Sequence, residues 1–121
     1  MSDSRNIFAF IRPANSVPKE PEATISNWTI YRVTFADGDI SDHLVGFIHG
    51  KSGRTTSAIQ SFNGELAQIT TFSGRKYTLY GPPGFTEDGN YVWKNWKLKC
   101  QVVEYLDVSD LYVYKIKNLL N

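Results

Sequence analysis

The chain has 121 residues, of which 41% are hydrophobic and 14% aromatic. This apolar content is enough for one hydrophobic core, and the length predicts a single domain. Thirteen basic and twelve acidic side chains give a formal net charge of +1. No whole-molecule field therefore draws the protein to nucleic acid or to an anionic membrane, and a charged partner would have to meet a local patch.

The cysteine count and the first residues predict a cytoplasmic protein. The single cysteine, Cys100, cannot form an internal disulfide, and no charged leader with a long apolar stretch and a cleavage site is present. The longest apolar run near the start, Ile7 to Ile11, is far shorter than the roughly 20 residues needed to span a bilayer. We therefore expect a reducing compartment and no transmembrane helix.

Residues 1–26 are predicted to form an N-terminal arm and linker, and residues 27–121 a β-rich globular domain. Five consecutive apolar residues, 7–11, are typical of a strand buried on both faces or of a segment that docks on a partner. The prolines and charged residues between Pro13 and Ser26 indicate an extended, poorly packed linker. We expect the arm to pair with an edge of its own sheet or of a second copy, which makes the protein a monomer or a homodimer.

Between Trp28 and Tyr80, short segments rich in β-branched and aromatic residues alternate with glycine-containing turns. The most regular pair of segments is 66–72 with 75–80, joined by Ser73-Gly74. Five consecutive strands with short links predict an antiparallel meander, curled into a half-barrel or packed under a helix. We therefore predict an α+β domain dominated by an antiparallel sheet, with one or two short helices.

The periodicity changes after the Pro82-Pro83-Gly84 turn. An apolar stripe at helical spacing predicts a short helix over Asn90–Lys99 that closes over the sheet, with Asp88 as its N-cap; the stripe consists of Val92, Trp93, Trp96, Cys100 and Val103. A further strand is the alternative, because tyrosine, valine and tryptophan also favour strands. Residues 102–108 are predicted to be a final strand, and 111–120 a helix or a strand.

Catalytic motifs are absent from the sequence. The glycines in Gly46 to Ser52 are one residue too close for a phosphate-binding loop, and the strand-like residues that follow are not the helix it requires. Lys51 and Arg54 are therefore interpreted as a solvated hairpin tip, with a phosphate contact as the alternative. Cys100 lies on the apolar stripe, where a free cysteine more often packs than reacts. We expect a protein without enzymatic activity and without a cofactor.

The two histidines do not form a metal site in this interpretation. On one strand, His43 and His49 would lie roughly 20 Å apart at about 3.3 Å per residue, too far to share an ion. Neighbouring Asp42 would point to the opposite face from His43. We expect these histidines to be hydrogen-bonded or exposed structural residues, and no metal site.

The segment from Arg75 to Lys99 combines cations with aromatic residues and is the main candidate for binding. The candidate residues in it are Arg75, Lys76, Tyr80, Phe85, Tyr91, Lys94, Lys97 and Lys99. Aromatic rings can stack on bases while cations meet phosphates, so single-stranded nucleic acid is one possible ligand. Alternatively, Trp93 and Trp96 are buried in the core and the lysines lie around it, exposed to solvent.

Protein recognition explains the same residues and is the preferred function, because tryptophan, tyrosine and arginine concentrate binding energy at interfaces. The stretch from Ser73-Gly74-Arg75 through Tyr77, Gly81-Pro82-Pro83-Gly84 and Tyr91-Val92-Trp93 to Trp96 resembles small bacterial proteins found on phages and other mobile elements. The resemblance carries over no known activity and no residue role. It does favour the role of a small non-enzymatic inhibitor of a host system. The nearly neutral charge argues against a DNA mimic.

Overall fold

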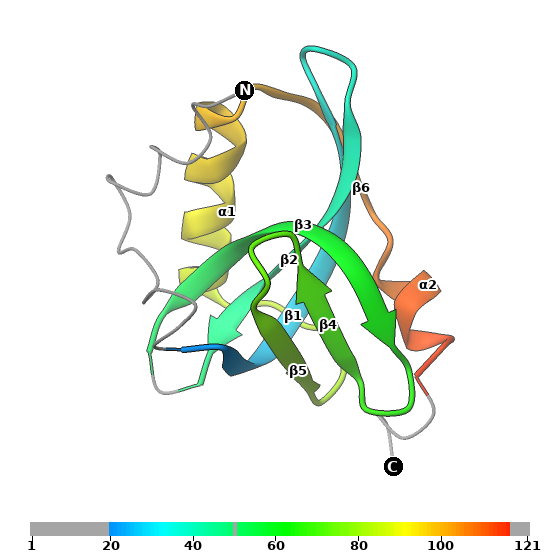
Figure 1. Ribbon diagram of the computed structural model, residues 1–121. Coiled ribbons are helices and arrows are strands. Elements are labelled where there is room, and N and C mark those ends of the chain that lie inside the picture. The colour runs from blue at the N-terminus through cyan, green and yellow to red at the C-terminus, as the bar shows by residue number, and fades with distance from the viewer. Residues whose placement is uncertain (1–19, 50, 117–121) are drawn as a thin grey trace.

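The structure, a computed structural model, describes residues 20–49 and 51–116 (Figure 1). Six strands and two helices follow in the order β1 (Glu22–Phe35), β2 (Ile40–Ile48), β3 (Gly53–Asn63), β4 (Gln68–Thr71), β5 (Lys76–Tyr80), α1 (Glu87–Lys99), β6 (Val102–Asp107) and α2 (Ser109–Val113). The strands form one mixed, mostly antiparallel sheet. The predicted α+β class is confirmed.

The first five strands pair in sequence order, and β1 closes the ring by pairing with both β2 and β5. The β1–β5 pairing is parallel, with Ile25 opposite Leu79, whereas the other pairings in the ring are antiparallel. A closed meander of five strands requires one parallel pairing. The strand direction alternates along the chain, so the first and fifth strands run in the same direction. The meander was predicted, but a ring closed by a parallel pair was not.

β1 begins at Glu22, inside the segment predicted to be a linker. Residues 22–26 pair with residues 76–80 of β5, and Ile25 is fully buried. The prediction of a poorly packed linker is therefore wrong for these residues, because the prolines end at Pro21 and the β-branched residues that follow find a partner strand. The predicted arm at 7–11 lies outside the described residues.

A bend at Asn27 divides β1 into two halves that pair with different strands. Asn27 has a positive φ of 48°, and the β1–β2 register shifts between Ser26 and Thr29. The indole of the next residue, Trp28, is buried and donates from Nε1 to the carbonyl oxygen of Gly81 at 2.9 Å. Beyond the bend, β1 pairs with β2 and β6, and this part of the hairpin extends away from the ring beside α1 (Figure 1).

The bend creates two hydrophobic cores. The first fills the ring and includes Trp28, Ile69 and Tyr77. The second lies between the extended β1–β2 hairpin and α1, and its buried members are Val33, Val45, Trp93 and Trp96. Tyr31 stacks on Trp93 with ring centroids 4.2 Å apart, which joins β1 directly to the helix.

α1 confirms the helix prediction for Asn90–Lys99 and excludes the strand alternative. Its N-cap is Thr86 rather than the predicted Asp88, because the Thr86 hydroxyl accepts from the backbone N–H of Gly89 at 3.0 Å. Asp88 instead lies in the first turn, where a carboxylate favours the positive end of the helix dipole. Val103, predicted on the same apolar stripe, lies on β6 and is exposed.

The C-terminal predictions are confirmed in part. The predicted strand at 102–108 is β6, and the helical alternative for 111–120 is represented by the short α2, while residues 117–120 lie outside the described part. Ser109 holds α2 against the ring, since its hydroxyl accepts from the N–H of Ile30 at 2.9 Å. Neither helix in the described residues has the length and apolar character to cross a membrane.

Glycine permits the close approach of α1 to the sheet. A Cβ atom on Gly53 would overlap the carbonyl oxygen of Asp88, and one on Gly89 would lie 3.1 Å from the carbonyl oxygen of Gly46. The helix start therefore packs on backbone rather than on side chains.

We predict that Gly53→Ala lowers stability by roughly 3 kcal/mol, at the upper end of the cost of overpacking, because the Asp88 backbone cannot yield without moving α1. Chemical denaturation measures the effect. Ser52→Ala is the matched control and should change stability by less than about 0.5 kcal/mol. Equal midpoints for the two variants would contradict the close packing.

We predict that Trp96→Ala costs about 3 to 5 kcal/mol, because the ring is 4% exposed and packs in the second core. Leu98→Ala, two residues along the same helix and 79% exposed, should be nearly neutral. Thermal unfolding of the two variants separates these expectations, and a small loss for Trp96→Ala would mean that the second core is not formed as described.

Candidate functional site

Arg75 is not available for binding at the surface, contrary to the prediction. The residue is 5% exposed, and its Nε donates to the carbonyl oxygen of Glu20 at 2.8 Å. Lys76 forms the adjoining link, since its backbone N–H donates to the carbonyl oxygen of Pro21 at 3.0 Å. The start of β5 thus holds the residues that lead into β1.

Lys51 is exposed in the turn between β2 and β3, as predicted for a solvated hairpin tip, but it and Arg54 are also paired with Glu20. Lys51 Nζ lies 2.9 Å from Glu20 Oε2, and a guanidinium nitrogen of Arg54 lies 4.0 Å from Glu20 Oε1. The hydrogen bond from Lys51 holds the pKa of Glu20 below its usual value, against the opposing effect of burial. A phosphate at these cations would therefore have to compete with a carboxylate already in place.

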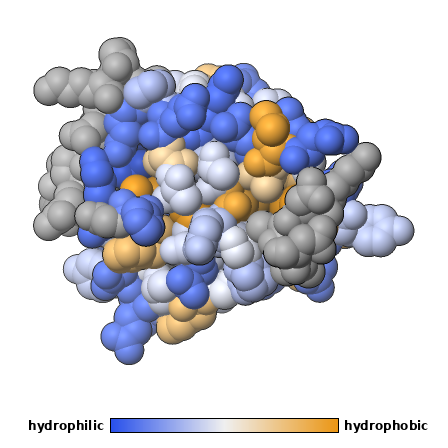
Figure 2. All heavy atoms as spheres, turned by 90° about the horizontal axis from the view of Figure 1, so that it is seen from below, coloured by the Kyte–Doolittle hydropathy of each residue, from blue (hydrophilic) through white to orange (hydrophobic). Residues whose placement is uncertain are grey.

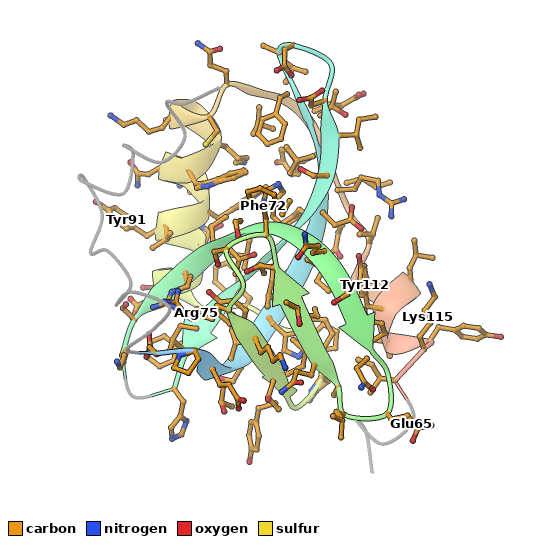
Figure 3. The ribbon with its side chains drawn as sticks, in the orientation of Figure 1. Glu65, Phe72, Arg75, Tyr91, Tyr112 and Lys115 are labelled. Atoms are coloured by element: carbon orange, nitrogen blue, oxygen red, sulfur yellow. The ribbon has the colours of Figure 1, made fainter. Side chains whose placement is uncertain are left out.

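The remaining predicted residues are exposed, except for the half-buried Lys97, but they lie on separate elements. Lys76 and Tyr80 are on β5, Phe85 precedes α1, and Tyr91 is on the outer side of α1 (Figure 3). The rings most suited to stacking on bases, Trp93 and Trp96, are buried. The sequence segment 75–99 therefore does not fold into one aromatic and basic groove.

The lysines of α1 divide between its two flanks. A helix turns by about 100° per residue, so Lys94 and Lys97 share one flank and Lys99 lies on the other. Lys97 marks the flank that faces β6, because its Nζ lies 4.2 Å from the ring centroid of Tyr105 and 5.2 Å from that of Trp93. Of the predicted lysines, Lys97 is thus brought next to β6, and Lys94 lies about one turn before it toward the solvent side.

β6 is an edge strand whose outer side meets no other strand among the described residues. The N–H of Val108, just after the strand, donates to Ile30 of β1. Because backbone groups alternate along an antiparallel strand, Leu106 also faces β1, and Tyr105 and Asp107 turn their N–H and C=O outward. An open edge of this kind readily accepts another strand.

Hydrophobic side chains flank this edge on both faces of the sheet. Val103 is 65% exposed, Leu106 is 64% exposed and Tyr105 is half exposed. Tyr105 lies on the α1 face, because it is opposite the buried Val33, and Leu106 lies on the outer face opposite Arg32. We call this the β6 surface: the open edge at Tyr105 and Asp107, the side chains of Val103, Tyr105 and Leu106, and the flanking Lys94 and Lys97.

Exposed hydrophobic residues elsewhere are more dispersed. In the view from below, hydrophobic side chains lie in small groups among hydrophilic ones (Figure 2). Phe72 is exposed in the β4–β5 turn and Tyr114 just after α2. Single exposed apolar residues are normal on soluble domains and indicate no site.

The groups capable of acid–base or nucleophilic chemistry are engaged or shielded. Both ring nitrogens of His43 are hydrogen-bonded, to Ser41 at 2.7 Å and to the Thr56 carbonyl at 2.9 Å. Burial raises the pKa of Cys100 to about 11, which keeps the thiol protonated and unreactive at neutral pH. Within 20–49 and 51–116, no group of three or more His, Cys, Asp or Glu residues could hold a metal ion.

A hollow beside the start of α1 is too small and open to suggest a ligand site. It has an empty volume of about 240 Å³ and is lined by residues that include Asn27, Phe85 and Asn90. Ligand pockets are usually clefts of about 300 to 1,000 Å³ that bury most of the ligand, whereas the volume of this hollow includes open solvent. Comparison of the chain with known protein families, curated proteins and solved structures gives no match.

The β6 surface was missed in the sequence, although residues 102–108 were predicted to be a strand. Exposed Val103, Tyr105 and Leu106 have the composition of a core strand. The lysines that flank them were assigned instead to a groove with Arg75. Only the position of β6 outside the ring makes its residues accessible.

His43 predicts a pH dependence of stability. Burial lowers the pKa of this histidine from its usual 6.5, despite the hydrogen bond to Thr56 and the nearby Asp42. Below about pH 6.5, the unfolded chain therefore binds a proton that the folded protein excludes, and stability falls as the pH decreases toward the folded pKa. We expect a lower melting temperature at pH 5.5 than at pH 7.5.

Two variants test the origin of this dependence. His43→Asn should be less stable throughout but lose most of the change between pH 5.5 and 7.5, whereas His49→Gln, at an exposed position, should retain it. An unchanged pH dependence in His43→Asn would assign the effect to other groups.

Proposed function

We propose that this protein is a non-enzymatic binding module that takes an extended segment of a partner protein along the open edge of β6. The observation that carries the proposal is the combination of outward-facing backbone at Tyr105 with exposed hydrophobic side chains at Val103 and Leu106. In strand addition, backbone hydrogen bonds supply affinity and alternate side chains supply specificity.

The β6 surface is rigidly supported, which lowers the entropic cost of binding. Tyr105 packs edge-on against Tyr31 and Trp93, with ring centroids 5.6 and 5.5 Å apart. Trp93 in turn stacks on Trp96 in the second core. A partner would therefore meet a preformed edge rather than order a loose one.

The alternative of single-stranded nucleic acid receives less support from the geometry. Arg75 is buried, Lys51 and Arg54 face Glu20, and the tryptophans lie in the core. The remaining lysines on α1 are split between two flanks. Measurable affinity for single-stranded DNA or RNA that falls steeply with salt would restore this alternative.

Inhibition of a host protein, the role implied by the resemblance to phage and mobile-element proteins, needs only a binding surface. An edge strand can occupy the pairing edge or docking groove of a target without any chemistry. We propose this as the biological setting of the binding activity.

Affinity capture from a nuclease-treated bacterial lysate tests the proposed function. A partner retained by the wild-type protein should be lost from Leu106→Asp, which places a charge beside the edge. Phe72→Asp is the matched control, because Phe72 is 73% exposed on another part of the molecule. This variant should capture the partner as the wild-type protein does.

Amide hydrogen exchange of the captured complex provides the second measurement. Strand addition should slow exchange at the backbone N–H groups of Tyr105 and Asp107. Equal capture by both variants, or unchanged exchange at these two positions, would overturn the proposal.

A further inference from the structure

We infer that the segment accepted by β6 alternates acidic with apolar residues, with its carboxylates directed to the α1 side. This inference rests on the proposed function and specifies its partner. It follows from the different chemistry of the two faces that border the open edge.

The pleat of the sheet sets the alternation. Side chains of an added strand would point by turns to the α1 face, beside Tyr105, and to the outer face, beside Leu106. Each face can therefore be matched to a different class of side chain in the partner.

The α1 face is basic at its centre. Lys97 lies over the Tyr105 ring, and Lys94 precedes it by about one turn on the same flank. Both ammonium groups belong to partly or fully exposed residues. Carboxylates of an added strand can reach this flank and form charge-assisted hydrogen bonds next to the aromatic cluster.

Acidic groups on this face lie toward its ends. Asp107 ends β6, and its carboxylate accepts from the N–H of Ser109 at 2.9 Å. Glu87 and Asp88 occupy the first turn of α1, about 15 Å along the helix from Lys97 at 1.5 Å per residue. Negative charge on an added strand is therefore favoured beside Lys97 and Tyr105 and disfavoured beside Asp107.

The outer face has an apolar centre. Leu106 is exposed there, and its cross-strand neighbour Arg32 is held by both oxygens of Asp42 at 2.8 and 3.0 Å. The Asp42 carboxylate already neutralises this cation, and it also accepts a hydrogen bond from Tyr112 at 2.6 Å. Glu104 flanks the outer face and disfavours a second carboxylate. Apolar side chains fit this side best.

Synthetic peptides provide the test, with the full chain as the binding protein. The probe is a labelled seven-residue peptide in which glutamate alternates with valine, and the matched control replaces each glutamate by lysine. Fluorescence anisotropy should show at least tenfold tighter binding of the glutamate peptide, with the difference reduced by salt. A version of the glutamate peptide with N-methylated backbone amides should bind much more weakly, because it cannot complete the strand pairing.

Charge reversal in the protein tests the assignment of the lysines. The double variant Lys94→Glu and Lys97→Glu should invert the preference and bind the lysine peptide more tightly. Lys76→Glu, an exposed lysine on β5, is the control and should keep the wild-type preference. Circular dichroism confirms that each variant remains folded.

The outcomes separate the inference from the proposed function. Equal binding of the glutamate and lysine peptides, with slowed amide exchange at Tyr105 and Asp107, would overturn the acidic preference and leave strand addition intact. Failure of every peptide to bind at millimolar concentration would overturn the inference, while the capture experiment still decides the function. A dimer in sedimentation that Leu106→Asp dissociates would assign the edge to a second copy and overturn the inference as well.

Discussion

The structure depends on the pairing of β1 with three other strands. Its first half joins β5 and β2 to close the ring, and its second half joins β2 and β6 outside the ring. The bend at Asn27 and Trp28 separates the two roles, because a straight strand could not serve both cores. The position of β6, and hence its open edge, follows from the length of β1 that projects beyond the ring.

The second core stabilises the part of the β1–β2 hairpin that extends beyond the ring. α1 covers one face of the extension, and its tryptophans meet Tyr31 and Val33 of β1. Glycines at positions 46, 53 and 89 allow the start of the helix to approach the strands. The same packing leaves Lys97 on the flank beside β6, so the chemistry of the candidate site is a consequence of how the helix packs on the sheet.

The distribution of cations shows why a local cluster in sequence is a poor guide to a surface. Arg75 was predicted to bind a partner, and Lys51 and Arg54 to form a hairpin tip, but all three cations contact Glu20 at the entry to β1. Burial of a charged group requires such compensation. The cation that lies beside the open edge is Lys97 of α1, which contacts the rings of Tyr105 and Trp93.

The sequence by itself determined the α+β class, the succession of strands and the helix at 90–99, because local periodicity and turn residues encode these features. The parallel closure of β1 on β5, the burial of Arg75 and the open edge of β6 were decided by tertiary structure. Each depends on contacts between residues far apart in the chain, such as Ile25 with Leu79 and Glu20 with Arg75. No local pattern reports which strand is left at the edge of a sheet.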